Sequence, residues 1–116
     1  MQLDHKMSKR PFNNKCPIWR ASDVMGHPCT LLILRELFLD ESCRFQDFEA
    51  RSRGFSKNTV SKRLKALVDQ GYVEMKPYEL HPPRYIYQLT KRGRKLGPIM
   101  EAMFAWGNAE IRSDNK

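Results

Sequence analysis

The chain has 116 residues, 41% of them hydrophobic, and carries 21 lysines and arginines against 13 aspartates and glutamates. This length allows one domain with one packed core, and the formal net charge of +8 favours an acidic partner such as nucleic acid, an anionic membrane or an acidic protein. The longest apolar run, residues 31–34, is too short to span a bilayer, so we expect no membrane partner.

The segment before Cys16 is polar and lacks the apolar centre of a signal peptide. We therefore expect a cytoplasmic protein whose three cysteines do not form a disulfide framework. Residues 1–14 are predicted to be a flexible basic arm and residues 112–116 a polar tail. The single domain is predicted to occupy residues 15–111.

Two helices are predicted at the start of this domain. The first spans about residues 17–25, because Pro17 suits the first helical position and Gly26 suits a stop. The second spans roughly residues 28–39 and is apolar on nearly all sides. That pattern is typical of a helix buried in the middle of a small domain.

A third and a fourth helix are predicted to follow as a helix-turn-helix. The third is short, about residues 44–53, and ends at Gly54. The fourth, about residues 56–70, begins after a turn of only a few residues. Ser56 suits its N-cap, and Gly71 suits its C-terminal end. Two short helices joined in this way, the second of them basic, are typical of a DNA-binding unit.

The fourth helix has one apolar face and one cationic, amide-bearing face. At about 100° per residue, one side collects Val60, Leu64, Leu67 and Val68. The opposite side collects Asn58, Lys62 and Lys65, flanked by Thr59 and Ser61. An ordinary surface helix also carries lysines on its solvent side, so this pattern alone leaves both interpretations open. The neighbouring elements favour a recognition helix.

A two-stranded ribbon is predicted next, since the apolar period changes to two over residues 72–77 and 84–90. Residues 78–83 form its proline-rich tip. An antiparallel ribbon directly after a recognition helix is a wing, and His81 and Arg84 would place it against a phosphate or the minor groove. The predicted fold class is therefore mainly α with a small β-ribbon, a winged helix-turn-helix with dimerisation helices at both ends.

The last helix is predicted to begin after Thr90 as N-cap and to run to about Ile111. Its apolar stripe is wide and rich in methionine and aromatic residues. The helix either closes its own core or forms a shared interface, and the width of the stripe favours a homodimer. A two-fold dimer presents its recognition helices to successive major grooves, about 34 Å apart, on a pseudo-palindromic site.

Several motifs along the chain are shared with one family of regulators. They are Cys16-Pro17, Gly26 with residues 30–37, Arg44-Phe45, residues 56–71, Pro82-Pro83-Arg84, residues 87–90 and Gly93-Arg94. With them the chain resembles the HxlR-type winged helix-turn-helix regulators of bacteria and archaea from Cys16 to about Trp106. The resemblance implies a homodimeric transcription regulator. It implies dimer contacts from the first and last helices, which we assign to Ile18, Leu96, Ile99, Met100, Met103 and Trp106.

The resemblance also implies which residues contact DNA. Carried over, it indicates Ser56, Lys57, Asn58, Thr59, Ser61, Lys62, Arg63 and Arg84. Asn58 can pair with adenine, and Lys62 or Arg63 can donate to guanine. Phosphate neutralisation is expected from Lys57, Lys65, Lys76 and Arg84. Arg63 points to the edge of the buried face, so a salt bridge within the protein competes with a DNA contact there.

The signal that such a regulator would sense is left open by the sequence. Cys16 precedes a helix and follows Lys15, which favours a thiolate, and some family members sense oxidants or electrophiles through a cysteine at such a place. The alternative is that Cys16 is only a small residue before a proline and that Cys29 and Cys43 are buried fillers. A further alternative is a small-molecule effector that binds at the dimer interface, between the first, second and last helices.

Other classes of function find little support. Residues 26–29, Gly-His-Pro-Cys, depart from the Gly-Gly-Lys-Trp usual in the family, but their histidine and cysteine lack the spacing of a metal site. No nucleophile–base pair or phosphate loop is readable, so we expect no enzyme, no metal and no cofactor. A winged-helix protein-interaction module without specific DNA binding is the remaining alternative, and duplex RNA is disfavoured by its narrow major groove.

Overall fold

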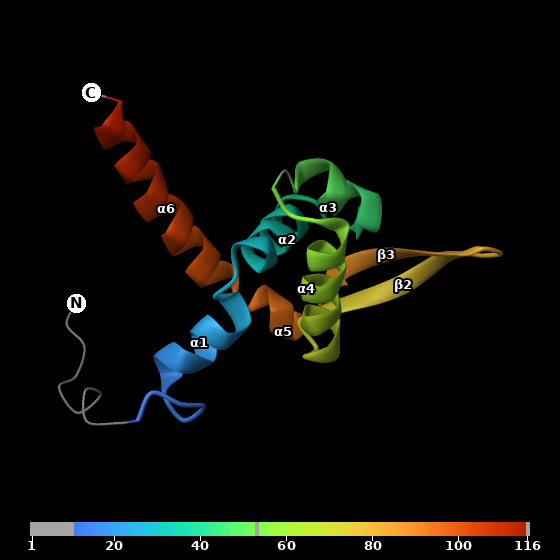
Figure 1. The fold of residues 1–116 in the computed structure, drawn as a ribbon, viewed down its shortest axis with the longest axis horizontal. Coiled ribbons are helices and arrows are strands. Elements are labelled where there is room, and N and C mark those ends of the chain that lie inside the picture. Colours follow the sequence, from blue (N-terminus) through green and yellow to red (C-terminus); the bar gives the residue numbers. More distant parts are fainter. Residues whose placement is uncertain (1–10, 53, 116) are drawn as a thin grey trace.

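The computed structural model describes residues 11–52 and 54–115, in which six helices and three strands alternate around one core (Figure 1). The elements are α1 (Pro17–Met25), α2 (Pro28–Leu39), β1 (Cys43–Arg44), α3 (Phe45–Arg51), α4 (Lys57–Asp69), β2 (Val73–Leu80), β3 (Pro83–Leu89), α5 (Lys91–Arg94) and α6 (Gly97–Asp114). The ribbon of β2 and β3 projects to one side, and α6 projects to the other. Most of the predicted basic arm, residues 1–10, lies outside the described residues.

Helix α2 lies at the centre of the core, as its apolar sequence predicted. Ile33 and Leu34 are fully buried, and the helix packs against α4 and α1. Helix α2 also contributes Cys29 and Leu37 to the core cluster, and the other elements contribute Met25, Cys43, Phe48, Val60, Leu64, Leu67, Val73 and Leu89. Burial of each large apolar side chain of this kind stabilises a fold by roughly 1.5–3 kcal/mol. The cluster is therefore the platform that fixes α4.

The sheet has three antiparallel strands in the order β1-β3-β2, so the prediction of a two-stranded ribbon was incomplete. Cys43 of β1 pairs with Tyr87 of β3. A strand of two residues has no period to recognise, and Arg44 was therefore assigned to the third helix, which instead spans Phe45–Arg51. This extra strand ties the base of the wing to the helix-turn-helix.

The strands of the wing extend further than predicted, because the proline-rich segment is mostly strand. β2 continues to Leu80 and β3 begins at Pro83, so most of the loop predicted at 78–83 is wrong. Pro83 is the first residue of its strand, and Pro77 lies beside a register shift on an edge strand. Both are positions where a missing N–H costs no ladder hydrogen bond.

The predicted last helix is two helices, with a break at residues 95–96. Thr90 is the N-cap as predicted, but of the short α5, where its Oγ1 accepts a hydrogen bond from Gly93 N at 3.0 Å. Pro98 explains the break, because proline cannot donate within a helix and its ring clashes with the preceding turn. In the structure it lies in the first turn of α6, where that clash does not arise.

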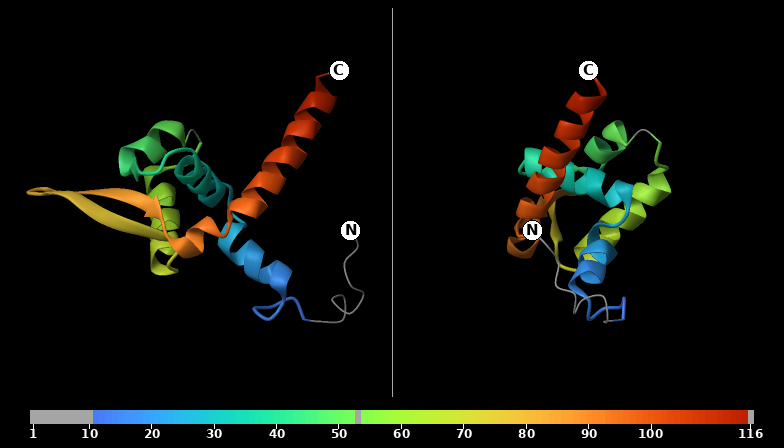
Figure 2. Two further views of the ribbon diagram at one scale, coloured as in Figure 1. Left: turned by 180° about the vertical axis from the view of Figure 1, so that it is seen from behind. Right: turned by 90° about the vertical axis from the view of Figure 1, so that its left-hand side faces the viewer.

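Helix α6 extends away from the other helices in both views of Figure 2. None of the residues of α6, all of which the structure describes, is buried. Phe104 and Trp106 are 73% and 70% exposed, and Ile111 is 60% exposed. The helix therefore presents a large apolar surface that its own protomer does not cover. Over the described residues, no helix combines the length and the apolar character needed to cross a membrane.

Candidate nucleic-acid interface

Helix α4 is fixed at its start and along its inner face. Ser56 is the N-cap, and its Oγ accepts a hydrogen bond from Thr59 N at 3.1 Å. Val60, Leu64 and Leu67 are at most 2% exposed and hold the helix against the core. The apolar face predicted from the sequence is therefore the buried one. The opposite face is left open to solvent.

The open face gathers most of the residues predicted to contact DNA. Asn58, Ser61, Lys62 and Lys65 are exposed, and Thr59 is half-buried. Together with Ser56 they surround one open depression on the surface of α4. Lys57 is exposed on the same helix but does not line this depression. The surface has amide, hydroxyl and ammonium groups side by side, which can donate to and accept from base edges and phosphates.

Arg63 does not belong to this surface. Its side chain is partly buried, and its positive charge acts on the thiol of Cys29 from beside it. The Nε of Arg63 is buried and, within the described residues, has no hydrogen-bond partner. The competing salt bridge predicted for it is not found in that part of the chain. The structure thus separates Arg63 from the six residues around the depression.

Three of the predicted phosphate-binding cations are held by neighbouring carboxylates. Lys65 pairs with Asp69 at 2.6 Å, Lys76 with Glu74 at 3.4 Å and Arg84 with Glu79 at 3.4 Å. All of these pairs are exposed, and an exposed pair contributes only about 0–1 kcal/mol. A phosphate can therefore replace the carboxylate at little cost. Among the described residues Lys57 and Lys62 have no such carboxylate partner.

The two wing cations lie on different surfaces. Lys76 lines a groove with the end of α2 and with Arg94 of α5. Arg84 lines another groove, together with Gln46 and Arg44 at the start of α3. The structure therefore does not bring Lys76 and Arg84 into one patch.

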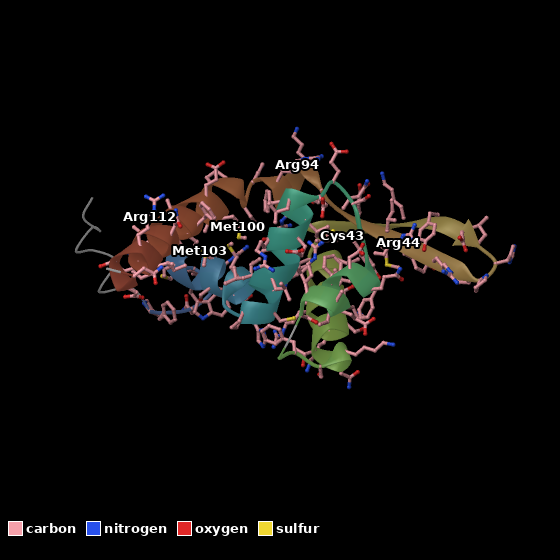
Figure 3. All side chains as sticks on the ribbon, turned by 90° about the horizontal axis from the view of Figure 1, so that it is seen from above. Cys43, Arg44, Arg94, Met100, Met103 and Arg112 are labelled. Carbon is pink, nitrogen blue, oxygen red and sulfur yellow. The ribbon has the colours of Figure 1, made fainter. Side chains whose placement is uncertain are left out.

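Arg44 is a cation beside Arg84 that the sequence did not mark as a candidate for DNA contact. Its guanidinium lies 4.8 Å from the ring centroid of Tyr78, and Figure 3 shows it at the base of the wing. A cation–π contact of this kind keeps the charge at the surface while fixing its position. The tyrosines along the ribbon, Tyr78, Tyr85 and Tyr87, were the available signal, but Arg44, the partner of Tyr78, lies in the unpredicted β1.

All three cysteines are buried, but they differ in their surroundings. Cys29 and Cys43 are buried, as the alternative of buried fillers predicted. Burial raises the pKa of Cys29, and burial together with the charges of Asp40 and Asp47 raises the pKa of Cys43 to about 11. Both thiols therefore stay protonated near neutral pH. Cys16 is the N-cap of α1 and is 8% exposed.

Metal binding finds no support in the geometry. In the part of the chain that the structure describes, no three histidine, cysteine, aspartate or glutamate side chains come together as a metal site would require. His27 has a structural role instead, because its Nδ1 accepts a hydrogen bond from Cys29 N at 3.0 Å and caps α2.

Comparison with known proteins places this fold in a family. The model of HxlR-like helix-turn-helix proteins matches residues 24–115. Rv3095 of Mycobacterium tuberculosis, an uncharacterized HTH-type transcriptional regulator, is 38% identical over 91 residues, which are 78% of this chain and 56% of the relative. The uncharacterized HTH-type transcriptional regulator sll1512 of Synechocystis is 36% identical over 100 residues, 86% of this chain and 73% of the relative. This chain thus spans little more than half the length of the mycobacterial relative.

A solved structure shares the fold as well. The redox regulator HypR in its oxidized form matches with a TM-score of 0.74 at 28% sequence identity, over 81% of this chain and 96% of HypR. The winged helix-turn-helix architecture predicted from the sequence is thereby confirmed. The family match covers the helix-turn-helix, the wing and all of α6. This chain belongs to the family of HxlR-like helix-turn-helix proteins.

Proposed function

We propose that this chain is a transcriptional regulator that binds specific sequences of double-stranded DNA through α4. The observation that carries the proposal is the polar, cationic face of α4, which is open to solvent while the apolar face is locked into the core. An α-helix fits the major groove of B-DNA, and its exposed side chains read the edges of the bases there. The family membership of the chain supports the same function.

The residues on this face have separable roles. Asn58 can donate to and accept from adenine, and Lys62 can donate to guanine, each pair discriminating by roughly 1–3 kcal/mol. Lys57 and Lys65 neutralise phosphates beside the groove. Arg84 and Lys76 do the same from separate surfaces of the wing. These phosphate contacts make the affinity fall with salt but carry no sequence information.

The proposal includes a homodimer that binds a pseudo-palindromic operator. Support comes from α6 and α1, where Ile18, Ile99 and Trp106 are 49%, 40% and 70% exposed. Leu96 and Met100, also predicted at the interface, pack partly against the core of their own protomer. Pairing two copies through the exposed residues would cover the apolar surface and present two α4 helices to one face of the duplex.

The test is DNA retardation with a duplex from the gene's own upstream region and a scrambled duplex of equal length. Lys62→Ala is expected to lose discrimination between the two duplexes. Lys76→Ala is expected to weaken both about equally. Lys95→Ala, on the exposed turn before α6, is the charge-matched control. It should discriminate between the two duplexes as the parent does, and its affinity for each should fall only as far as the loss of one positive charge explains. Reversed effects of Lys62→Ala and Lys76→Ala would refute the assignment of roles. Absence of any salt-sensitive, sequence-dependent binding would favour a protein-interaction module.

We also propose that oxidants or electrophiles act on this regulator through Cys16. Cys16 is the N-cap of α1, follows the basic Lys15 and keeps 8% of its surface exposed. The other two thiols are held protonated by burial. The test compares DNA binding before and after peroxide in the parent, in Cys16→Ser and in Cys43→Ser. Loss of the response only in Cys16→Ser supports the proposal, and an unresponsive parent refutes it.

A further inference from the structure

A groove of about 490 Å³ lies between α2, the segment before α4 and α6. Its walls are apolar and include Leu32 of α2, Phe55, and Met100 and Phe104 of α6. Figure 3 shows Met100 and Met103 on the side of α6 that faces α2. The volume and the aromatic and thioether lining suit a small organic molecule.

Two arginines lie at the edge of this groove. The side chains of Arg35 and Arg51 are 56% and 55% exposed and belong to the lining. Both hydrogen-bond to the carboxylate of Glu36, which is only 2% exposed: Arg35 Nε donates to Oε2 at 2.9 Å, and Arg51 Nη1 donates to Oε1. The carboxylate fixes the two guanidinium groups in place.

The charge of this cluster is not balanced. Two guanidinium groups share one buried carboxylate, which leaves one positive charge beside the apolar groove. Among the described residues each guanidinium donates a single hydrogen bond, so further N–H donors face solvent. Asp40 and Asp47 act on Arg51 from a longer distance but do not line the groove. An apolar pocket with one fixed surplus cation is complementary to a monoanion with an apolar body.

We propose that this groove binds a small organic acid, with its carboxylate on Arg51 and Arg35 and its aromatic or aliphatic body between α2 and α6. A planar guanidinium binds a carboxylate through parallel hydrogen bonds, which gives both charge and geometric complementarity. The binding site itself does not depend on DNA binding. Only its regulatory consequence, a change in DNA affinity, rests on the proposed function.

The groove and the predicted dimer surface overlap on α6, because Met100 and Met103 line the groove and were also assigned to the dimer interface. At about 100° per residue, Met100 and Phe104 lie on one edge of the apolar stripe, and Ile99 and Trp106 lie on the other. The first edge faces the groove, while the residues on the second line none of the described grooves. A second copy seated on Ile99 and Trp106 alone leaves the groove for the acid, whereas a copy that also covers Met103 competes with it.

The experiment is calorimetric titration of the full chain with 2-naphthoate, and with the neutral 2-naphthamide as a matched ligand of the same shape. The acid is expected to bind about tenfold more tightly than the amide. Arg51→Gln should weaken binding of the acid about tenfold, whereas Glu36→Gln should tighten it several-fold because it raises the local charge. Arg94→Gln on α5 is the control that removes a distant charge. Circular dichroism checks that each variant is folded.

Arg51→Gln and Glu36→Gln are expected to change the affinity for the acid in opposite directions. Structural damage would instead weaken binding of the acid in both variants. Equal affinity for acid and amide, or no saturable binding of the acid, overturns the proposal. So does exclusion of the acid as the chain dimerises, because the second copy would then occupy the groove. A positive titration with failed DNA retardation would refute the proposed function and leave the acid site intact.

Discussion

Replacing Gly93 with alanine is expected to destabilise the fold strongly, because the structure leaves no room for a methyl group there. A Cβ at this position would lie 2.0 Å from Tyr72 O and 3.1 Å from Leu89 Cδ2. The same Tyr72 carbonyl accepts a hydrogen bond from Thr90 N at 3.1 Å. The backbone of α5 therefore cannot move away from Tyr72 without stretching the bond that joins the end of β3 to the start of β2.

The size of the effect follows from this geometry. The Cβ and Tyr72 O must move about 1 Å apart, from 2.0 Å to the 3.0 Å below which a Cβ essentially never approaches another heavy atom. Overpacking costs roughly 1–3 kcal/mol, and loss of a buried hydrogen bond adds roughly 0.5–1.5 kcal/mol. We therefore expect Gly93→Ala to lower the free energy of unfolding by about 3 kcal/mol, a large share of the 5–15 kcal/mol typical of a domain.

The assay is urea unfolding followed by circular dichroism, at one fixed protein concentration because association shifts the apparent stability. Gly107→Ala is the matched control. A Cβ there meets no atom within 4 Å of the described chain, and alanine suits a helix interior better than glycine by about 1 kcal/mol. The control should be as stable as the parent or more stable. A Gly93→Ala variant within about 1 kcal/mol of the parent would refute the argument from the close approach.

Three further predictions concern the cap, the buried carboxylate and the dimer. Ser56→Ala should lower the free energy of unfolding by about 1 kcal/mol, because the first turn of α4 loses its cap, and urea unfolding measures this. Burial alone would raise the pKa of Glu36, but hydrogen bonds from its two arginines outweigh burial and lower the pKa. The stability that they supply is present above the unfolded pKa of about 4.3 and is lost as the pH falls through the lower folded value. In Glu36→Gln, the urea concentration at the unfolding midpoint should therefore fall less steeply with decreasing pH below about pH 4.3 than in the parent. The same dependence on pH in both proteins would contradict this. Trp106→Ser should raise the dissociation constant of the proposed dimer roughly 30-fold in sedimentation experiments, because a central tryptophan contributes about 2 kcal/mol.

The sequence predicted the helices that carry their own signals. The bounds of α1 and α2 agree with the prediction, because a proline marks each start and Gly26 separates them. The N-cap Ser56 and the terminal Gly71, with its φ of +82°, delimit α4 as predicted. In these elements the local chemistry and the apolar period agree, and no distant contact is needed to place them.

What the sequence could not predict depends on contacts between distant segments. The strand β1 exists only through its pairing with β3, and Arg44 acquires its neighbour Tyr78 only by that pairing. The groove beside α6 likewise combines α2, the end of α3 and α6, and no local pattern links Arg35 to Arg51. The break before α6 is different, because Pro98 was a readable signal. One continuous helix was predicted nevertheless, because apolar residues continue on both sides of Pro98.

Coupling between the groove and DNA can be tested through its reciprocity. Phe55 lines the groove and directly precedes Ser56, the N-cap of α4, while the opposite wall is α6. An acid bound between them therefore contacts both the residue before the N-cap of α4 and α6, the helix proposed to form the dimer. A tenfold change in DNA affinity requires about 1.4 kcal/mol of differential binding. One hydrogen bond to a charged group, worth roughly 1.5–3 kcal/mol, is sufficient if the acid makes it in only one arrangement.

Linkage then fixes the converse experiment. If 2-naphthoate weakens operator binding by a given factor, saturating operator DNA must weaken 2-naphthoate binding by the same factor. Calorimetric titration of the acid into the free protein and into the protein–operator complex measures that factor, and a scrambled duplex at equal concentration is the control. Equal affinities for the acid with and without operator would mean that the groove binds its ligand without regulating α4. A ligand that binds the DNA-free and DNA-bound states equally well does not change the equilibrium between them.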